Sequence, residues 1–252
     1  MRWYFNVLRE HTPGAELRDD ELDEMFGLYG PNHDVCRADF GDRVRGGFDH
    51  VVRFRERGSG RLVGFTGVRA RIIRLASGRR IPTLYSGLSF VLPEARGLGL
   101  LPVVLSYYAL RLKLRAPAET VWVWSDAISY KPYILTARRI TRVYPSRHGP
   151  TPDFVRELRD RLGAEYYGEH YDAATGCVRK DHKRLKEHVA PILERDLEDP
   201  DIRFYAEHNP GHVDGHGLMM LIPGDMKNIL TVLSYRRPSE ARRRPNRKLV
   251  NV

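Results

Sequence analysis

Up to residue 140 the chain alternates between strand-like and helix-like hydrophobic patterns. Residues 3–8 (WYFNVL) are rich in aromatic and β-branched side chains and predict a strand. A helix follows, because apolar side chains recur there at the spacing of a single helix face: Leu22, Met25, Phe26 and Tyr29. Asp19 or Asp20 can cap this helix, and Gly30-Pro31 ends it. A second, weaker helical pattern occupies the thirties and forties of the sequence.

Three further hydrophobic runs predict an antiparallel meander. Residues 49–56 and 61–73 are rich in β-forming residues, and the turn Gly58-Ser59-Gly60 between them is typical of a hairpin. Residues 81–92 predict the next strand of the same meander. After a long apolar helix, residues 121–124 predict one more strand, which a further helix follows.

The segment between strand 81–92 and the long helix carries the strongest chemical signal. It reads PEARGLGLLP (residues 93–102) and precedes the apolar run VVLSYYALRLKL. Such a turn gathers unpaired backbone N–H groups and the positive end of a helix dipole at one point, which suits a pyrophosphate. Gly97 and Gly99 let a ligand approach the backbone closely, and Pro102 fits the first helical turn. Taken alone, the same residues also fit a simple strand-to-helix connection.

Composition narrows the class of protein. The chain has 252 residues, of which 42% are hydrophobic and 29% charged, as in a globular protein and unlike a fibrous or disordered one. No stretch approaches the roughly 18 consecutive apolar residues of a membrane span, and the start lacks a signal-peptide core, so we expect a cytoplasmic protein. Cys36 and Cys177 lie far apart and support neither a disulfide framework nor a zinc site of thiolates.

The positive charge of the chain is concentrated at its end. The formal net charge is +10, and the residues from Arg236 onward carry six of these charges with almost no apolar side chains. This composition predicts a disordered basic tail over residues 236–252. An arm that binds nucleic acid is the alternative, but solvated basic ends are more common, so we do not expect nucleic acid as a partner.

The pattern after residue 140 is less regular. Thr151-Pro152-Asp153 predicts the start of a helix that Gly163 ends. Residues 181–197 predict a charged amphipathic helix with a kink at Pro191. Residues 202–207 and 218–222 predict two strands of a last hairpin. The loop between these strands holds three histidines and an aspartate: His208, His212, Asp214 and His216. A binding loop, a plain loop and a metal site are all open, although the spacing matches no known metal motif and we predict no metal.

Up to about residue 140, the order of the elements resembles the GNAT superfamily of N-acyltransferases, which bind acyl-coenzyme A. The family signature is Arg or Gln, two residues, Gly, one residue, then Gly or Ala. The matching residues here are Arg96, Gly97, Leu98, Gly99, Leu100 and Leu101, with Leu101 at a position where a small residue is usual. The resemblance implies that these six residues bind the coenzyme. It also implies that a backbone N–H at Phe90 or Val91 polarises the thioester carbonyl.

A second part of the resemblance follows strand 121–124. Family members commonly carry Asn-x-x-Ala-x-x-x-Tyr there, and this chain has Asp126, Ser129 and Tyr133 at the same spacing. The resemblance implies that Ser129 contacts the coenzyme, that Asp126 lies near the pantetheine arm and that Tyr133 is the general acid, because a phenol can protonate a departing thiolate. Tyr133 as a packing aromatic and Asp126 as a helix N-cap are the alternatives. Candidates for the general base are Tyr85, Glu94, Asp126 and His208.

Together these features predict an α/β fold of GNAT type, with a mixed, mostly antiparallel central sheet flanked by helices. We expect one domain over residues 1–235, with a helical insertion at about 141–200. The predicted activity transfers an acetyl or longer acyl group from acyl-CoA to a primary amine of a small molecule or peptide. We expect the acceptor to contact Tyr85, His208, Asn209, His212 and His216. Two alternatives stay open: an acidic acyl carrier protein as donor, because the chain is basic, and a non-catalytic module that senses coenzyme A or a partner.

Overall fold

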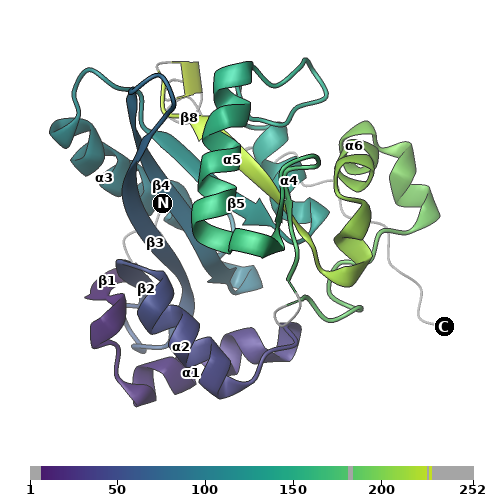
Figure 1. Cartoon of the computed structure of the whole chain (residues 1–252). Coiled ribbons are helices and arrows are strands. Elements are labelled where there is room, and N and C mark those ends of the chain that lie inside the picture. Colours follow the sequence, from purple (N-terminus) through teal and green to yellow (C-terminus); the bar gives the residue numbers. More distant parts are fainter. Residues whose placement is uncertain (1–6, 181–183, 226, 229–252) are drawn as a thin grey trace, which may run out of the picture.

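A single mixed sheet organises the residues that the computed structural model describes, which are 7–180, 184–225 and 227–228 (Figure 1). Its strand order is β1-β2-β3-β4-β5-β8-β7-β6. The strands are β1 (Val7–Pro13), β2 (His50–Glu56), β3 (Leu62–Arg74), β4 (Arg80–Val91), β5 (Trp122–Ala127), β6 (Tyr171–Asp172), β7 (Cys177–Val178) and β8 (Gly217–Pro223). β4 and β5 pair in parallel, and the other neighbours are antiparallel. The predicted α/β fold with a mixed, mostly antiparallel sheet is confirmed.

Helices cover both faces of this sheet. They are α1 (Asp19–Tyr29), α2 (Arg37–Gly47), α3 (Leu100–Arg115), α4 (Tyr130–Ala137), α5 (Asp153–Tyr167) and α6 (Pro200–His208). On the face toward which Tyr85 and Trp124 point, here called the first face, the core is closed by α1, α2 and α5. On the second face, α3 closes one cluster around Leu84, whereas α4 and α6 close another around Ala127. The second face therefore has two separate helical covers, with the β4–β5 boundary between them.

Up to residue 140 the predicted order of elements is confirmed. The helix that ends at Tyr29, the weaker helix after it and the three-stranded meander correspond to α1, α2 and β2–β4. The strand predicted from residue 3 is described only from Val7, because residues 1–6 lie outside the described part of the chain. The predicted tail, residues 236–252, also lies outside it. None of the helices in the described ranges has the length and apolar character needed to cross a membrane.

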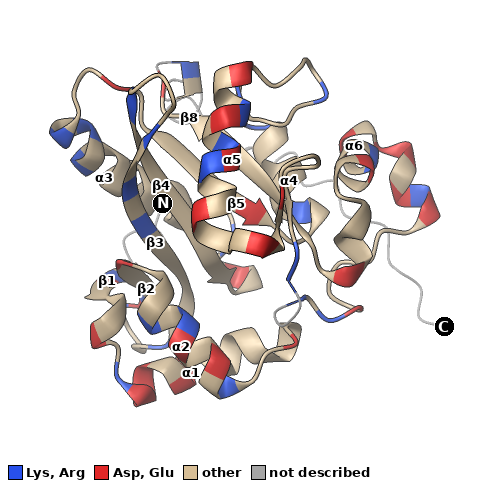
Figure 2. Cartoon of the chain, in the orientation of Figure 1, with Lys and Arg blue, Asp and Glu red and all other residues tan. Residues whose placement is uncertain are grey.

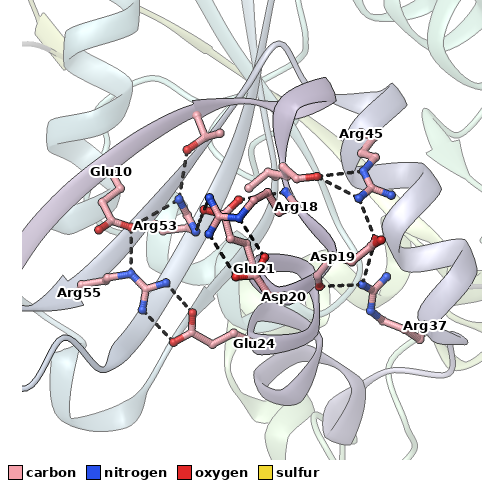
Figure 3. A network of polar contacts seen from close by, with 12 residues as sticks. Glu10, Arg18, Asp19, Asp20, Glu21, Glu24, Arg37, Arg45, Arg53 and Arg55 are labelled. Atoms are coloured by element: carbon pink, nitrogen blue, oxygen red, sulfur yellow. Dashed lines mark hydrogen bonds and ion pairs between the residues drawn. The ribbon is translucent and has the colours of Figure 1, made fainter.

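Ion pairs attach α1 to the edge of the sheet (Figure 3). Arg53 of β2 donates to Glu21 of α1 at 2.6 Å, and the two side chains are only 7% and 9% exposed. Arg55 of the same strand bridges Glu10 and Glu24 at 2.8 and 2.5 Å. Burial disfavours the Glu21 carboxylate, but the Arg18 amide and the Arg53 guanidinium hold its pKa below the usual value. These side chains line a polar pocket of about 410 Å³.

Beyond residue 140 the sequence pattern predicts less of the structure. The helix predicted to end at Gly163 continues to Tyr167 as α5. A Cβ atom at Gly163 would lie 2.5 Å from the Tyr171 ring, so this glycine makes room for an aromatic side chain inside the helix. Because a glycine within a helix and a glycine after its end look alike in a sequence, the predicted end was wrong.

The helix predicted for residues 181–197 is also wrong over residues 184–197, and residues 181–183 lie outside the described part of the chain. Residues 184–193 form an irregular segment that bonds to the α1–α2 connection, with Asp34 N–H donating to the Arg184 carbonyl at 2.9 Å and Lys186 N–H to Asn32 at 3.1 Å. A short 3-10 turn, Glu194–Glu198, follows. The charged side chains that suggested a helical surface belong to an irregular segment that contacts the α1–α2 connection at one end and α4 further on, where Lys131 Nζ donates to the Val189 carbonyl at 2.7 Å.

The strand predicted for residues 202–207 is the helix α6. Asp199 caps it by accepting from Asp201 N–H at 3.0 Å, and Pro200 occupies its first turn. Its buried apolar residues Ile202 and Tyr205 are three positions apart, which fits a helix face better than a strand. The strand predicted at residues 218–222 is confirmed as β8, but the predicted hairpin is wrong, since β8 pairs with β5 and β7.

Candidate functional site

β4 and β5 separate in the middle of the sheet. Their parallel pairing covers three positions, Thr83–Trp122, Leu84–Val123 and Tyr85–Trp124. Beyond Tyr85, β4 continues to Val91 and β5 continues to Ala127, but the two no longer pair. Beyond Tyr85 the facing edges of two central strands are thus not paired with each other, between the covers formed by α3 and α4. This unpaired stretch is here called the opening, and its backbone groups suit an extended ligand.

A bulge in β4 lies within this diverging part. The register with β3 shifts between Phe65–Phe90 and Gly67–Gly87, so β4 holds one extra residue there. Leu88, in this bulge, has φ 54°, a left-handed conformation that non-glycine residues rarely adopt.

The bulge sets the direction of the backbone N–H groups that follow it. Leu92 N–H donates to the Val63 carbonyl at 2.9 Å. Since hydrogen-bonded pairs alternate along an antiparallel ladder, Phe90 N–H is directed to β3 and Val91 N–H to the diverging edge. Of the two predicted positions, Val91 therefore has the N–H that faces the opening.

The glycine turn adopts the conformation that its sequence predicts. Gly97 and Gly99 have φ of 80° and 70°, and a Cβ atom at either would point into open space. Arg96 braces the turn, because its Nε donates to the Val91 carbonyl at 3.0 Å. Within the described part of the chain, the amides of residues 97–101 make no hydrogen bond; they belong to the turn, to the N-cap residue Gly99 and to the first two residues of α3. The turn thus presents several free N–H donors at a helix N-terminus, which fits a phosphate ligand.

The leucines of the signature pack into the core, whereas the glycines allow the backbone conformation of the turn. Leu98 and Leu100 are buried in the cluster beneath α3, and Leu101 packs against the same cluster. They attach the turn to the sheet. The bulk of Leu101, unusual for the family signature, is accommodated in this apolar contact and not among the free amides.

Asp126 is the centre of a buried polar cluster on the first face. Tyr85 donates its hydroxyl to Asp126 Oδ1 at 2.7 Å, from the last position at which β4 and β5 pair. Lys180, two residues after β7, forms an ion pair with Asp126 Oδ2, and the two side chains are only 8% and 5% exposed. The Tyr167 hydroxyl, at the end of α5, lies 3.4 Å from the Tyr85 hydroxyl. Three elements, β4, β5 and α5, thus meet the segment after β7 at the point where the strands separate.

The protonation states in this cluster follow from its charges. Burial favours the neutral acid, but the Lys180 ammonium and the Arg43 guanidinium outweigh it and hold the pKa of Asp126 below its usual value. Burial, together with the Asp126 charge, raises the pKa of Tyr85 and that of Tyr167. At neutral pH the cluster therefore holds one carboxylate, two neutral phenols and two cations.

Tyr133 lies on the second face, in α4, among the residues that α6 covers. Its ring stacks on Phe204 with centroids 5.8 Å apart, and its hydroxyl donates to the Pro145 carbonyl at 3.4 Å. The side chain is buried, and burial raises its pKa. It is a neutral phenol within the cluster that α4 and α6 close. Ser129 is the N-cap residue of α4 and is half-buried.

The predicted acceptor residues are not gathered at one place. Tyr85 lies at the opening, whereas Asn209 is buried and donates to the Tyr205 hydroxyl at 3.0 Å and the His216 carbonyl at 2.7 Å. His208 stacks on Phe204 at 3.8 Å. The 3-10 turn Pro210–Asp214 contains His212. In the described ranges, no group of histidine, cysteine and acidic side chains is arranged to hold a metal ion.

Of the candidate bases, Glu94 is exposed and pairs with Arg61 at 3.1 Å. Sequence reasoning missed Lys180, Tyr167 and Arg43, which complete the cluster around Asp126. Their positions carry no local motif. Each reaches the cluster through a contact with residues far away in the sequence.

Solved structures similar to this chain, all at low identity, include acetyltransferases and a probable N-acyltransferase. The acetyltransferase from Trypanosoma brucei is 17% identical, with a TM-score of 0.37, and the match covers 58% of this chain and 99% of that one. The GNAT family N-acetyltransferase from Escherichia coli, solved in complex with CoA, is 14% identical with a TM-score of 0.33, over 48% of this chain and 63% of that one.

A third similar structure is the Probable N-Acyltransferase from Enterococcus faecalis, 15% identical with a TM-score of 0.36. That match covers 52% of this chain, but only about a third, 32%, of the length of that protein. No protein-family model and no curated protein matches the chain.

Proposed function

We propose that the chain is an N-acyltransferase that takes an acetyl or longer acyl group from acyl-CoA and transfers it to a primary amine. The observation that carries this proposal is the separation of β4 and β5 beyond the Tyr85–Trp124 pair, directly beside a glycine turn with free amides. The pantetheine arm of CoA is extended and contains amide groups, which can hydrogen-bond to the unpaired strand edges as a neighbouring strand would. The pyrophosphate of CoA can accept hydrogen bonds from the amides of residues 97–101.

The reaction needs little beyond orientation and polar stabilisation. The amine nitrogen attacks the thioester carbonyl, a C–N bond forms, the C–S bond breaks, the nitrogen loses a proton and the thiolate gains one. In our assignment, Val91 N–H donates to the carbonyl oxygen on which negative charge develops. Tyr133, a neutral phenol in α4, gives its proton to the sulfur.

The role of Asp126 follows from its ion pair. A carboxylate whose pKa is held down is a weak base, so it is poorly suited to taking the amine proton. It is well suited to stabilising the positive charge that nitrogen acquires during attack. We therefore assign electrostatic stabilisation to Asp126 and orientation of its carboxylate to Tyr85, with the amine proton passing to water.

One observation favours a second candidate, a CoA-binding module without catalysis. Both oxygens of Asp126 already have partners in the fold, Tyr85 and Lys180. The carboxylate therefore has less capacity left to interact with the nitrogen of an acceptor. Such a module binds CoA as an enzyme does but releases no thiol when amines are added. An acyl carrier protein as donor is a further form of the enzyme, in which the pantetheine arm arrives on a protein.

Thermal unfolding with CoA, acetyl-CoA and longer acyl-CoA tests the proposal. A ligand at about 100 times its Kd stabilises the fold by about 2.7 kcal/mol, which raises Tm by roughly 5–10 °C for a chain of this size. A shift that is largest for one acyl length identifies the donor. Thiol release with an amine panel then separates the enzyme from the non-catalytic module. No shift with any of these compounds overturns the proposal for free CoA.

The glycine turn offers a matched pair of variants. Gly97 and Gly78 have φ of 80° and 82°, and at both positions a side chain would extend into open space. Gly97→Leu and Gly78→Leu therefore carry the same backbone strain, but only the first puts a side chain beside the free amides. We expect both to lower Tm and only Gly97→Leu to remove the shift with CoA.

A further inference from the structure

A row of three polar or aromatic side chains crosses the first face beside the opening. Arg69 of β3 pairs with Tyr85 of β4, and Tyr85 pairs with Trp124 of β5, so the three are neighbours on one face of adjacent strands. Tyr166 of α5 covers the row. Its ring centroid lies 4.6 Å from that of Trp124 and 5.8 Å from that of Tyr85, and the Arg69 guanidinium lies 4.7 Å from its ring.

Hydrogen-bond donors in this row lack acceptors. Arg69 Nε, Trp124 Nε1 and the Tyr166 hydroxyl are all buried, and none has a hydrogen-bond partner in the described part of the chain. Trp124 is 0% exposed. A buried donor without a partner costs free energy, and native proteins seldom keep several together. The first two groups can only donate, so the missing partner is an acceptor atom.

The charges around the row leave it positive. Figure 2 shows cationic positions along β3 where this strand passes beside α5. The nearby Asp49 carboxylate does not neutralise Arg69, because it accepts from the Arg71 guanidinium at 3.0 Å and from Ala70 N–H at 2.8 Å. Across the row, Asp126 is paired with Lys180. Among the described residues, Arg69 forms no ion pair, so its charge has no counter-ion.

The row also adjoins the place where we expect the acceptor amine. The Tyr85 ring lies 4.4 Å from that of Trp124, and the Tyr85 hydroxyl bonds to Asp126. One tyrosine therefore separates the donor row from the carboxylate at the opening.

We propose that Arg69, Tyr166 and Trp124 form a subsite for an anionic group of the acceptor, so that the substrate is an amine that also carries a carboxylate or a phosphate. This inference rests on the proposed function and specifies its substrate class. The anionic oxygen accepts from the three donors, while the amine nitrogen reaches the opening beside Asp126. The Tyr166 hydroxyl stays a donor at neutral pH, because burial raises the pKa of this phenol to about 12.

Isothermal titration calorimetry at constant ionic strength tests the subsite. The probes are ω-amino carboxylates from glycine to 6-aminohexanoate, the neutral amide of each, and O-phosphoethanolamine with ethanolamine as its neutral partner. Each is titrated with and without CoA. We expect at least one anionic probe to bind about tenfold or more tighter than its neutral partner, as for a charge-assisted hydrogen bond. The carboxylate and phosphate arms show which anion the site takes.

Three variants locate the binding. Arg69→Met and Tyr166→Phe each remove a donor without a partner, and both are expected to lose the preference for the anionic probe. Arg71→Met is the control, because this arginine lies two positions along the same strand but is paired with Asp49. It should keep the preference.

Equal binding of anionic and neutral probes by the wild type, including no binding of either, overturns the inference. An anionic preference that survives in Arg69→Met also overturns it. Failure of the proposed function is recognised separately, by the absence of any heat or Tm shift with CoA itself.

Discussion

The Tyr85 hydroxyl donates to the Asp126 carboxylate at 2.7 Å across the point where β4 and β5 part. Tyr85 is the last residue of β4 that pairs with β5, and Asp126 is two residues beyond its partner Trp124 on the same face. The hydrogen bond therefore joins two strands where their ladder has ended. It holds the opening of the sheet at a fixed geometry and orients a buried carboxylate toward it.

Removing this hydrogen bond should cost stability. We expect Tyr85→Phe to lower the free energy of unfolding by about 1.5–3 kcal/mol, the usual contribution of a hydrogen bond to a charged group. Tyr166→Phe is the control, since that hydroxyl is buried without a partner and its removal should be neutral or stabilising. Urea unfolding measures both. Equal losses in the two variants would show that the Tyr85 hydroxyl contributes nothing specific.

The Lys180–Asp126 ion pair predicts a strong coupling between two distant positions. Lys180→Met leaves a buried carboxylate without its ammonium and should destabilise the fold by about 3–5 kcal/mol. Adding Asp126→Asn removes the uncompensated charge, so the double variant should be more stable than Lys180→Met alone. A double-mutant cycle from urea unfolding gives the coupling. Strictly additive effects would contradict the pair.

Stability should depend on pH through His33, which is 8% exposed and stacks on Tyr29 with centroids 3.5 Å apart. Burial lowers its pKa from 6.5 to about 4. Between about pH 6.5 and 4 the unfolded chain binds a proton here that the folded chain does not. The free energy of unfolding therefore falls as pH drops through this window, by on the order of 3 kcal/mol, and is fully retained above it.

His33→Asn checks the origin of this dependence, because it removes the titrating group and leaves a side chain able to donate to the Tyr29 carbonyl. The unfolding free energy of the variant should vary less between pH 6.5 and 4 than that of the wild type. A parallel pH profile in the two proteins would assign the effect to other groups.

Tyr133→Phe tests the proposed proton donor. Loss of general acid catalysis should reduce kcat by about 10²–10⁴, while the Tm shift with CoA stays the same. Tyr130→Phe, three residues earlier in α4, is the matched control and should keep its rate. An unchanged kcat in Tyr133→Phe would make this residue a packing aromatic against Phe204.

Sequence reasoning predicted the parts of this fold that depend on local patterns. The helix containing Leu22 and Met25 and the turn around Gly97 and Gly99 follow from hydrophobic spacing and from the backbone freedom of glycine. Tyr85 and Asp126 were each identified as candidates, one as a base and one by family resemblance. Their hydrogen bond was not predicted, because it depends on the register between two strands 41 positions apart.

The C-terminal half was harder to predict for the same physical reason. Residues 202–207 are apolar and aromatic enough for a strand, but the Asp199 cap and Pro200 in the first turn favour a helix. Lys180 and Tyr166 acquire their roles only when distant elements pack together. Contacts between residues far apart in the sequence determine the roles of such residues, and the local spacing of hydrophobic residues does not reveal those contacts.

The most direct test of the central claim is an NMR titration of the protein with CoA that follows backbone amide resonances. If CoA binds as proposed, the largest shifts belong to the amides of Gly97 and Gly99 and their neighbours up to residue 101, and Gly78 in its similar turn does not move. Saturable binding with shifts confined elsewhere, or no shift at the glycine turn at any CoA concentration, would contradict the account.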